Sequence, residues 1–180
     1  MAESESKPKS ETKTNGKSND SQEMPKAQYK HFQSLRRHIS LVIDAAQILG
    51  ERLIEEGDID LGRILVANSF LHDNSKFYGI EWRDLQRDEE VEKVKNAVLQ
   101  HTETNHHHPE FWGDMNNMPS VFLAEMVCDW WARSSEMGTD LRLWIKGSAL
   151  SKYDISPQGK AYKQIKRFVD LLLDKPFGKL

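Results

Sequence analysis

LHDNSK, residues 71–76, is the stretch that decides the fold, because it places His72 and Asp73 side by side after an apolar helical segment. Imidazole and carboxylate together are the ligand set for zinc, manganese, iron or cobalt. Adjacent residues can share one metal at a helix end, where the regular helical phase relaxes. The stretch therefore predicts a metal site whose other ligands lie elsewhere in the chain.

The other candidate ligands lie on both sides of this stretch. All seven histidines fall between residues 31 and 108, and a domain has little reason to bury many polar rings unless something binds them. Three consecutive rings cannot all point inward, so we expect one or two of the triplet to face the site, with His107 ahead of His108. The candidate partners are His38, His101, the triplet His106–His107–His108, and Asp129.

Hydrophobic periodicity predicts helices through most of the chain, because apolar residues recur at steps of three and four. No segment sustains the alternation with period two that is typical of strands. Asp60 is a suitable N-cap for the second helix, and Pro109 suits the first turn of a short one. The predicted fold is an all-α bundle with helices near residues 28–57, 60–73, 91–101, 109–113, from 118 past 129, and 157–174.

The polar candidates lie where these helices should meet. His38, His101 and Asp129 each fall on the apolar stripe of a different predicted helix. Side chains on inward stripes can converge on one point inside a bundle, and a carboxylate placed between two metals could bridge them. Such a site lowers the pKa of bound water toward about 7 and so supplies hydroxide at neutral pH.

The first 26 residues differ in composition from the rest of the chain. They are almost all Ser, Lys, Glu, Thr and Asn, with too little apolar surface to offset the entropy of ordering. We expect residues 1–26 to be a disordered, solubilising tail rather than a targeting peptide. Residues 27–180 are predicted to form one domain with a sizeable core.

The overall composition is typical of a globular protein and gives no indication of a membrane-spanning or nucleic-acid-binding one. The 180 residues are 38% hydrophobic, and the net charge of -3 gives no strong case for nucleic acid or a membrane surface as partner. No apolar run approaches the roughly 20 residues that a membrane span needs. The single Cys128 cannot form an internal disulfide, which fits a reducing compartment. We expect a cytoplasmic protein and leave its oligomeric state open.

The motifs, in this order, resemble the HD superfamily of metal-dependent phosphohydrolases. LHDNSK matches the HDxxK motif of that superfamily. RHISLVIDAAQIL, residues 37–49, resembles its first helix with His38 as ligand, and LAEMVCDWWA, residues 123–132, resembles its last with Asp129 as ligand. The resemblance covers roughly residues 30 to 135, and HTETNHHHPEFW is also similar to a little-characterised group of bacterial and phage HD-related proteins of unknown function.

The resemblance implies an HD-like helical metal-binding domain at residues 27–180. It also implies a phosphohydrolase acting on a nucleotide or related phosphate ester, with Lys76, Asp73 and His101 in catalysis and with one or two divalent ions (Mn, Fe, Co, Zn or Mg). Members with two metals usually separate the third and fourth histidine stations by a couple of dozen residues, whereas His101 and His107 are six apart. The implied metal ligands are His38, His72, Asp73, His101, His107 and Asp129.

Other interpretations stay open. Some HD-fold proteins with ligands in the order His, His-Asp, His, His, Asp are mixed-valent di-iron oxygenases, and a metal-stabilised binding module would carry the same pattern without catalysis. Arg133 could neutralise a buried Asp129, and Lys76 could be a cation at a helix end rather than a phosphate clamp. His31 lies near the predicted tail and is interpreted as a surface residue.

Overall fold

The computed structural model describes residues 24–86 and 89–174, and all regular structure in those ranges is helical. This confirms the predicted all-α fold. The predicted tail lies almost wholly outside the described residues, and the first helix begins at Lys26. In chain order the elements are α1 (Lys26–Glu55), α2 (Ile59–Ser69), η1 (Asn74–Phe77), α3 (Gly79–Asp84), α4 (Val91–Thr104), α5 (Pro109–Trp112), η2 (Met115–Asn117), α6 (Ser120–Met137), α7 (Leu141–Trp144), η3 (Ile145–Ala149), α8 (Leu150–Lys152) and α9 (Lys160–Leu173).

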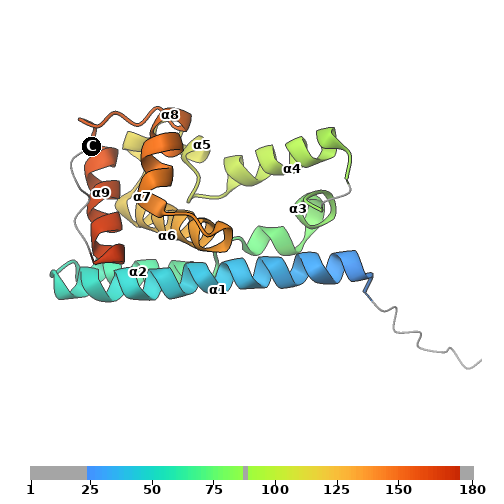
Figure 1. The fold of residues 1–180 in the computed structure, drawn as a ribbon, viewed down its shortest axis with the longest axis horizontal. Helices are drawn as coiled ribbons and strands as arrows, with labels where there is room; N and C mark the ends of the chain where they lie inside the picture. The colour runs from blue at the N-terminus through green and yellow to red at the C-terminus, as the bar shows by residue number, and fades with distance from the viewer. Residues whose placement is uncertain (1–23, 87–88, 175–180) are drawn as a thin grey trace, which may run out of the picture.

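The long helix α1 and the shorter α2 form an antiparallel hairpin along one side of the molecule (Figure 1). In α1 a stripe that includes Leu35, Val42 and Leu49 is buried at helical spacing, so this face turns toward the core. The helix ends at Glu55, and Gly57 then takes a φ of 97°, which a residue without a Cβ adopts at no steric cost. The chain is thereby turned back into α2.

Two glycines allow α1 and α2 to approach closely. A Cβ on Gly62 would overlap the backbone oxygen of Gly50 and would lie 2.8 Å from a side-chain carbon of Ile54. A Cβ on Gly50 would lie 2.6 Å from a methyl carbon of Val66. The two helices therefore reach backbone contact because neither residue carries a side chain.

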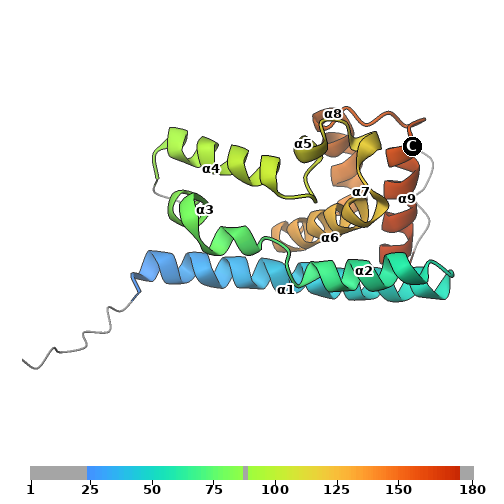
Figure 2. The same cartoon turned by 180° about the vertical axis from the view of Figure 1, so that it is seen from behind.

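Helix α6 crosses the α1–α2 hairpin and lies at the centre of the core (Figure 2). Its residues from Leu123 to Cys128 are all buried, because α1, α2, α7 and α9 pack on different sides of it. It follows Pro119 and ends at Met137, after which Gly138 has a φ of 66°. The amphipathic α9 packs on α6 and α1 through its buried face, which consists of Ala161, Tyr162, Ile165, Phe168, Val169 and Leu172.

Helices α3 and α4 lie beside the N-terminal half of α1, away from the core around α6 (Figures 1 and 2). α4 packs mainly on α3 and α5, and Ala97 and His101 are its only fully buried residues. Val91 and Val98 recur with His101 at helical spacing, and this spacing predicts a buried stripe, but both valines are exposed, so that prediction is wrong in part. α4 is held to the rest of the molecule chiefly at its C-terminal end.

The structure differs from the predicted elements in several places. The helices α3 and α7–η3–α8 were not predicted, and η3 is a single π-helical turn. The N-cap of α2 is Asp58, not Asp60, and α2 stops at Ser69, so that His72 and Asp73 lie in a turn. Among the described helices none is both long and apolar enough to cross a membrane.

Candidate metal centre

Separate segments of the chain bring the predicted ligands to one place at the junction of α1, α4 and α6. His38 comes from α1, His101 from α4 and Asp129 from α6, while the others come from the turn after α2 and the loop before α5. All six are buried or nearly so. The predicted ligands that converge are His38, His72, Asp73, His101, His107 and Asp129.

An unusual backbone conformation presents the adjacent His72 and Asp73 to the same centre. Asp73 has a φ of 54°, in the left-handed region that aspartate tolerates better than most residues. The turn is closed by bonds from the His72 N–H to the Ser69 carbonyl and from the Lys76 N–H to the Asp73 carbonyl. Both side chains can therefore face inward, which a regular helix would prevent by turning one away.

The first station consists of His38, His72 and Asp129 together with Oδ2 of Asp73. The His38 Nε2 atom lies 3.0 Å from Asp129 Oδ1, and the Nε2 atoms of His38 and His72 each lie 3.7 Å from Asp73 Oδ2. Ligand atoms about 2.0–2.2 Å from a shared ion lie roughly 3–3.6 Å apart in tetrahedral or octahedral geometry. These four residues could therefore hold one ion after small adjustments.

The second station consists of His101, His107 and His108 together with the other oxygen of Asp73. Oδ1 of Asp73 lies 3.1 Å from His101 Nε2 and 3.6 Å from His107 Nε2. Ligand nitrogens of the three histidines lie within 4.8 Å of one another, which also suits a metal ion. Asp73 thus directs one carboxylate oxygen toward each station, in the position of a bridge between two ions.

Each of three histidines has a carboxylate behind it. The Nδ1 atoms lie 3.2 Å from Glu136 for His38, 3.0 Å from Glu125 for His72 and 2.7 Å from Glu81 for His101. Such carboxylates fix the ring orientation and raise the basicity of the opposite nitrogen. The Nε2 atoms of all three histidines, like those of His107 and His108, are buried and have no hydrogen-bond partner among the described residues.

Those unpartnered Nε2 atoms test whether a metal fits the site. A buried ring nitrogen without a hydrogen bond carries a desolvation cost. There are five of them here in the described part of the chain, four of which lie within 3.7 Å of an Asp73 oxygen, and a metal ion would satisfy such a set. His72, His107 and Glu125 could also be grouped as ligands through Nδ1. We assign Glu125 the supporting role instead, because its Oε1 lies behind both rings, 3.0 and 3.6 Å from their Nδ1 atoms.

The supporting carboxylates were not predicted from the sequence, although the spacing of two of them from Asp129 could have indicated their position. Glu125 precedes Asp129 by four residues and Glu136 follows it by seven, so all three share one face of α6. Carboxylates at those offsets from a predicted ligand could have been proposed. Glu81 comes from α3, a helix that the periodicity did not reveal, and Ser75 donates a hydrogen bond to it.

The histidines outside the predicted ligand set differ in position. His108 reaches the second station, as the second choice in the triplet, whereas His106 stacks on Phe122 and its ring lies apart from the centre. His31 is not a simple surface residue, because it is half-buried with its ring centroid 5.2 Å from that of Trp82. Cys128 is a fully buried thiol.

Arg133 and Lys76, for which the sequence left two roles open, form ion pairs with different carboxylates. Arg133 donates to Glu136 at 3.0 Å, and no ion pair links it to Asp129 among the described residues. Lys76 donates to Asp73 Oδ2 at 2.7 Å, and its side chain is only 16% exposed. Lys76 therefore belongs to the centre, whereas Arg133 acts on the carboxylate behind His38.

A cavity of about 400 Å³ opens beside this centre. Its lining includes His107 and His108 of the second station, Asp129 of the first, and Lys76. The opposite wall comes from the end of α6 and from the segment α7–η3–α8. A small molecule in this cavity would therefore touch the metal centre from one side.

Comparison with known proteins places this arrangement in a family. Residues 27–170 match the model of a family of unknown function, DUF5662. The chain belongs to that family. No curated protein and no solved structure gives a significant match. The matched residues include all six predicted ligands, and the family has no assigned activity.

Within this member of the family, the histidines at the cavity are held neutral. Burial, reinforced by the nearby His72, keeps the pKa of His107 well below its usual value. Burial and the nearby His101 lower the pKa of His108 to about 4. Both rings are therefore neutral near pH 7, and neutral imidazole is the form that binds a metal.

The carboxylates of the centre are held in their charged form. Burial opposes ionisation of Asp73, but His72 and Lys76 outweigh it and keep the pKa of Asp73 well below its usual range. Burial likewise opposes ionisation of Asp129, and the His38 ring, whose Nε2 atom lies 3.0 Å from Asp129 Oδ1, overcomes it and lowers the pKa. Burial disfavours the His72 cation, yet the negative charges around it, Asp73 foremost, raise its pKa. Asp73 and Asp129 are thus anionic, which is the form of a carboxylate that binds a metal.

Proposed function

We propose that this protein is an HD-type, metal-dependent phosphohydrolase acting on a nucleotide or related phosphate ester. One observation carries the proposal: a buried centre with two ligand stations, bridged by Asp73, borders a cavity that also receives Lys76. The order of the ligands along the chain, which resembles the HD superfamily, supports it as well.

The charges around the centre favour two ions over one. Glu136 is already paired with Arg133, which leaves the carboxylates of Asp73, Glu81, Glu125 and Asp129 against the ammonium of Lys76. Metal ligation requires neutral histidines, so in the metal-bound centre four negative charges and one positive charge would leave three negative charges. One divalent ion leaves the centre negative, whereas two leave one positive charge, which an anion such as a phosphate group can match.

The residues of the centre would have two roles, as metal ligands and as carboxylates that orient those ligands. His38, His72 and Asp129 would hold one ion and His101, His107 and His108 the other, with Asp73 shared between them. Bound divalent ions would supply Lewis acidity and a water whose pKa falls toward about 7. Glu81, Glu125 and Glu136 would keep the three rings oriented by accepting from their Nδ1–H groups.

Lys76 is the residue through which the charged phosphoryl group would be stabilised. Its Nζ atom binds Asp73 Oδ2 and its side chain also lines the cavity. With Asp73 Oδ2 serving as a metal ligand, the Lys76 ammonium would be free to turn toward the cavity, where it would lie near a phosphoryl oxygen that gains charge in the transition state. A point charge placed there stabilises the transition state more than the ground state.

The test compares Lys76→Met with wild type at matched metal content. Phosphate release from a panel of nucleotides, with Mn, Co, Fe, Mg or Zn added, should fall by roughly 10²- to 10³-fold in the variant. Lys95→Met removes an exposed lysine of α4 and should leave turnover unchanged. Equal activity in wild type and Lys76→Met would remove this lysine from the mechanism.

A di-iron oxygenase is the second candidate, because the structure brings together all six residues in the order His, His-Asp, His, His, Asp. Purified protein would then contain iron, change colour on oxidation and consume oxygen, and wild type would release no phosphate. A binding module would hold metal but would neither consume oxygen nor release phosphate. Elemental analysis of the purified protein followed by these two assays separates the three functions.

A further inference from the structure

The cavity beside the metal centre has a second wall, opposite the metal ligands, that contributes no ligand to either station. This wall consists of Trp130 and Met137 from the C-terminal half of α6, Trp144 from α7, and Tyr153, which directly follows α8. None of the candidate metal ligands comes from α7, η3 or α8. A cavity of about 400 Å³ is in the lower part of the range of roughly 300–1,000 Å³ that is typical for small-molecule sites.

The rings of this wall are held in fixed positions. Trp130 is 5% exposed, and its ring centroid lies 5.1 Å from that of Trp144 in an edge-to-face arrangement and 5.7 Å from that of Tyr153 in a stacked one. Both geometries are favourable for aromatic pairs. Trp144 remains half-buried, so part of its indole ring is available to the cavity.

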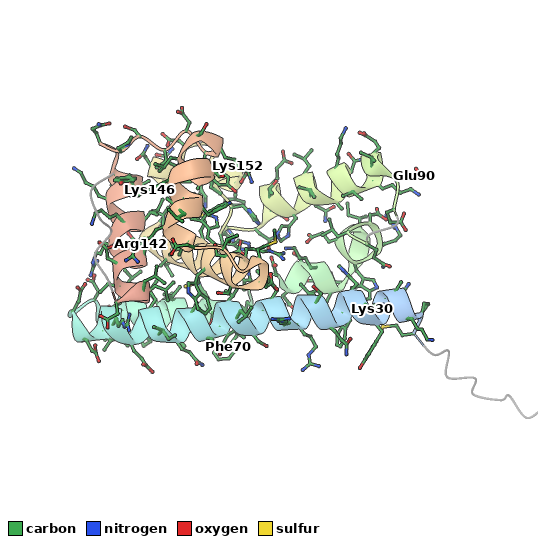
Figure 3. All side chains as sticks on the ribbon, viewed as in Figure 1. Lys30, Phe70, Glu90, Arg142, Lys146 and Lys152 are labelled. Carbon is green, nitrogen blue, oxygen red and sulfur yellow. The ribbon has the colours of Figure 1, made fainter. Side chains whose placement is uncertain are left out.

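The charges in the cavity favour an anion. Lys76, Arg133 and Lys152 line it, and Asp129, a residue of the metal centre, is the one carboxylate among the lining residues. Lys152 lies over the ring of Tyr153 at 4.7 Å, on the α8 side of the molecule (Figure 3). The cavity therefore combines cations and metal ligands at one end with exposed aromatic surface at the other.

We propose that this aromatic wall binds the leaving group, and that the substrate is a phosphomonoester whose alcohol carries one flat ring system. Trp144 is the specificity-determining residue, since its ring borders the cavity and is positioned by Trp130. The inference rests on the proposed function for the reaction and goes beyond it for the part of the substrate that does not react. The size of the cavity matches one nucleoside-sized unit rather than a polymer.

The test uses a pair of substrates that differ only in the ring. Adenosine 5′-monophosphate carries a base, and ribose 5-phosphate lacks it. Trp144→Ala should raise the KM for the nucleotide roughly tenfold, the scale of losing one stacked base, and should change kcat little. The KM for ribose 5-phosphate should not change. Trp144→Phe should restore most of the affinity, because it returns an aromatic face.

Leu143→Ala is the matched control, because Leu143 lies on the same short helix, is 70% exposed and does not line the cavity. Metal content and melting temperature of each variant are measured alongside, so that a loss of folding is recognised. The inference is overturned if Trp144→Ala changes the KM for both substrates equally, or if the wild-type KM is the same for both.

Equilibrium binding separates failure of this inference from failure of the proposed function. Calorimetric titration of metal-loaded protein with adenosine, which has a ring and no phosphate, requires no turnover. Binding that weakens roughly tenfold in Trp144→Ala and recovers in Trp144→Phe supports the aromatic wall even if no phosphate is released. Binding that is equal in wild type and Trp144→Ala contradicts it even if the protein hydrolyses nucleotides.

Discussion

At the scale of single residues, substitution of Asp73 should affect metal binding most, because each of its two carboxylate oxygens faces a different station. Asp73→Asn should therefore abolish both bound ions, whereas His38→Ala and His101→Ala should each remove the ion of one station and leave roughly half of the metal. Asparagine also tolerates the left-handed backbone of this position. Elemental analysis of the purified variants measures the loss.

His106→Ala serves as the control for these variants, because its ring stacks on Phe122 and should not affect metal content. Full metal in Asp73→Asn would show that the carboxylate does not bridge. Equal and complete loss in His38→Ala and His101→Ala would show that the two stations do not load independently.

The lowered pKa of His108 should make the metal-free protein less stable in acid. The pKa of His108 is about 4 in the folded chain and about 6.5 when unfolded, so between those values the unfolded chain binds a proton that the folded chain does not. The free energy of unfolding should therefore fall by about 2–3 kcal/mol as pH drops from 6.5 to 4, through this group alone. His108→Gln should lack that part of the pH dependence.

Urea denaturation in the presence of a chelator, at several pH values, measures the difference between wild type and His108→Gln. The comparison cancels the contributions of His72 and the carboxylates, which both proteins share. Parallel pH profiles for the two proteins would contradict the assignment of a buried neutral ring to His108.

At the scale of single residues, the ligands could be predicted where chemistry and helical phase coincide. His38 and Asp129 lay on stripes of buried apolar residues, and His72 and Asp73 stood out as an adjacent pair. His101 lay at the same helical spacing, but Val91 and Val98 of its helix are exposed. His107 and His108 could not be separated, because their orientation depends on the loop before α5 and not on a periodic pattern. Glu81 could not be found, because nothing in its neighbourhood indicated that it lies behind His101.

At the scale of elements, long amphipathic helices were predictable and short ones were not. α1, α6 and α9 repeat their apolar residues over several turns, which gives a clear period. α3 and α7 have six and four residues, too few for a period to emerge. α7–η3–α8 forms where its residues pack on α6, so its structure follows from tertiary contacts.

The crossing of α1 and α2 gives a prediction about stability. Gly62→Ala should lower the free energy of unfolding by about 1–3 kcal/mol, because the new methyl group overlaps the backbone of Gly50. The intrinsic preference of alanine for helices would offset this by at most about 1 kcal/mol. Gly147→Ala is the control, since a Cβ there meets no atom within 4 Å. Denaturant titration compares them, and equal stability of the two variants would refute the close approach.

At the scale of the whole molecule, the centre joins α1, α4, α6 and two connecting segments. Metal that binds only the folded chain at a free concentration of 100 times its Kd stabilises it by about 2.7 kcal/mol. For a chain of this length, removal by a chelator should lower the Tm by roughly 5–10 °C. Differential scanning calorimetry measures this, and Asp73→Asn should show no response to the chelator.

The weak attachment of α4 has a consequence for local opening. Only Ala97 and His101 of this helix are fully buried, and its main packing partners are the short helices α3 and α5. A metal bond to His101 would therefore be the strongest link between α4 and the core. Without it, the amides of α4 should exchange with deuterium through small openings, while those of α6 exchange only when the whole chain unfolds. The exchange rate along this one helix would then report how many molecules in a sample carry the ion at the second station.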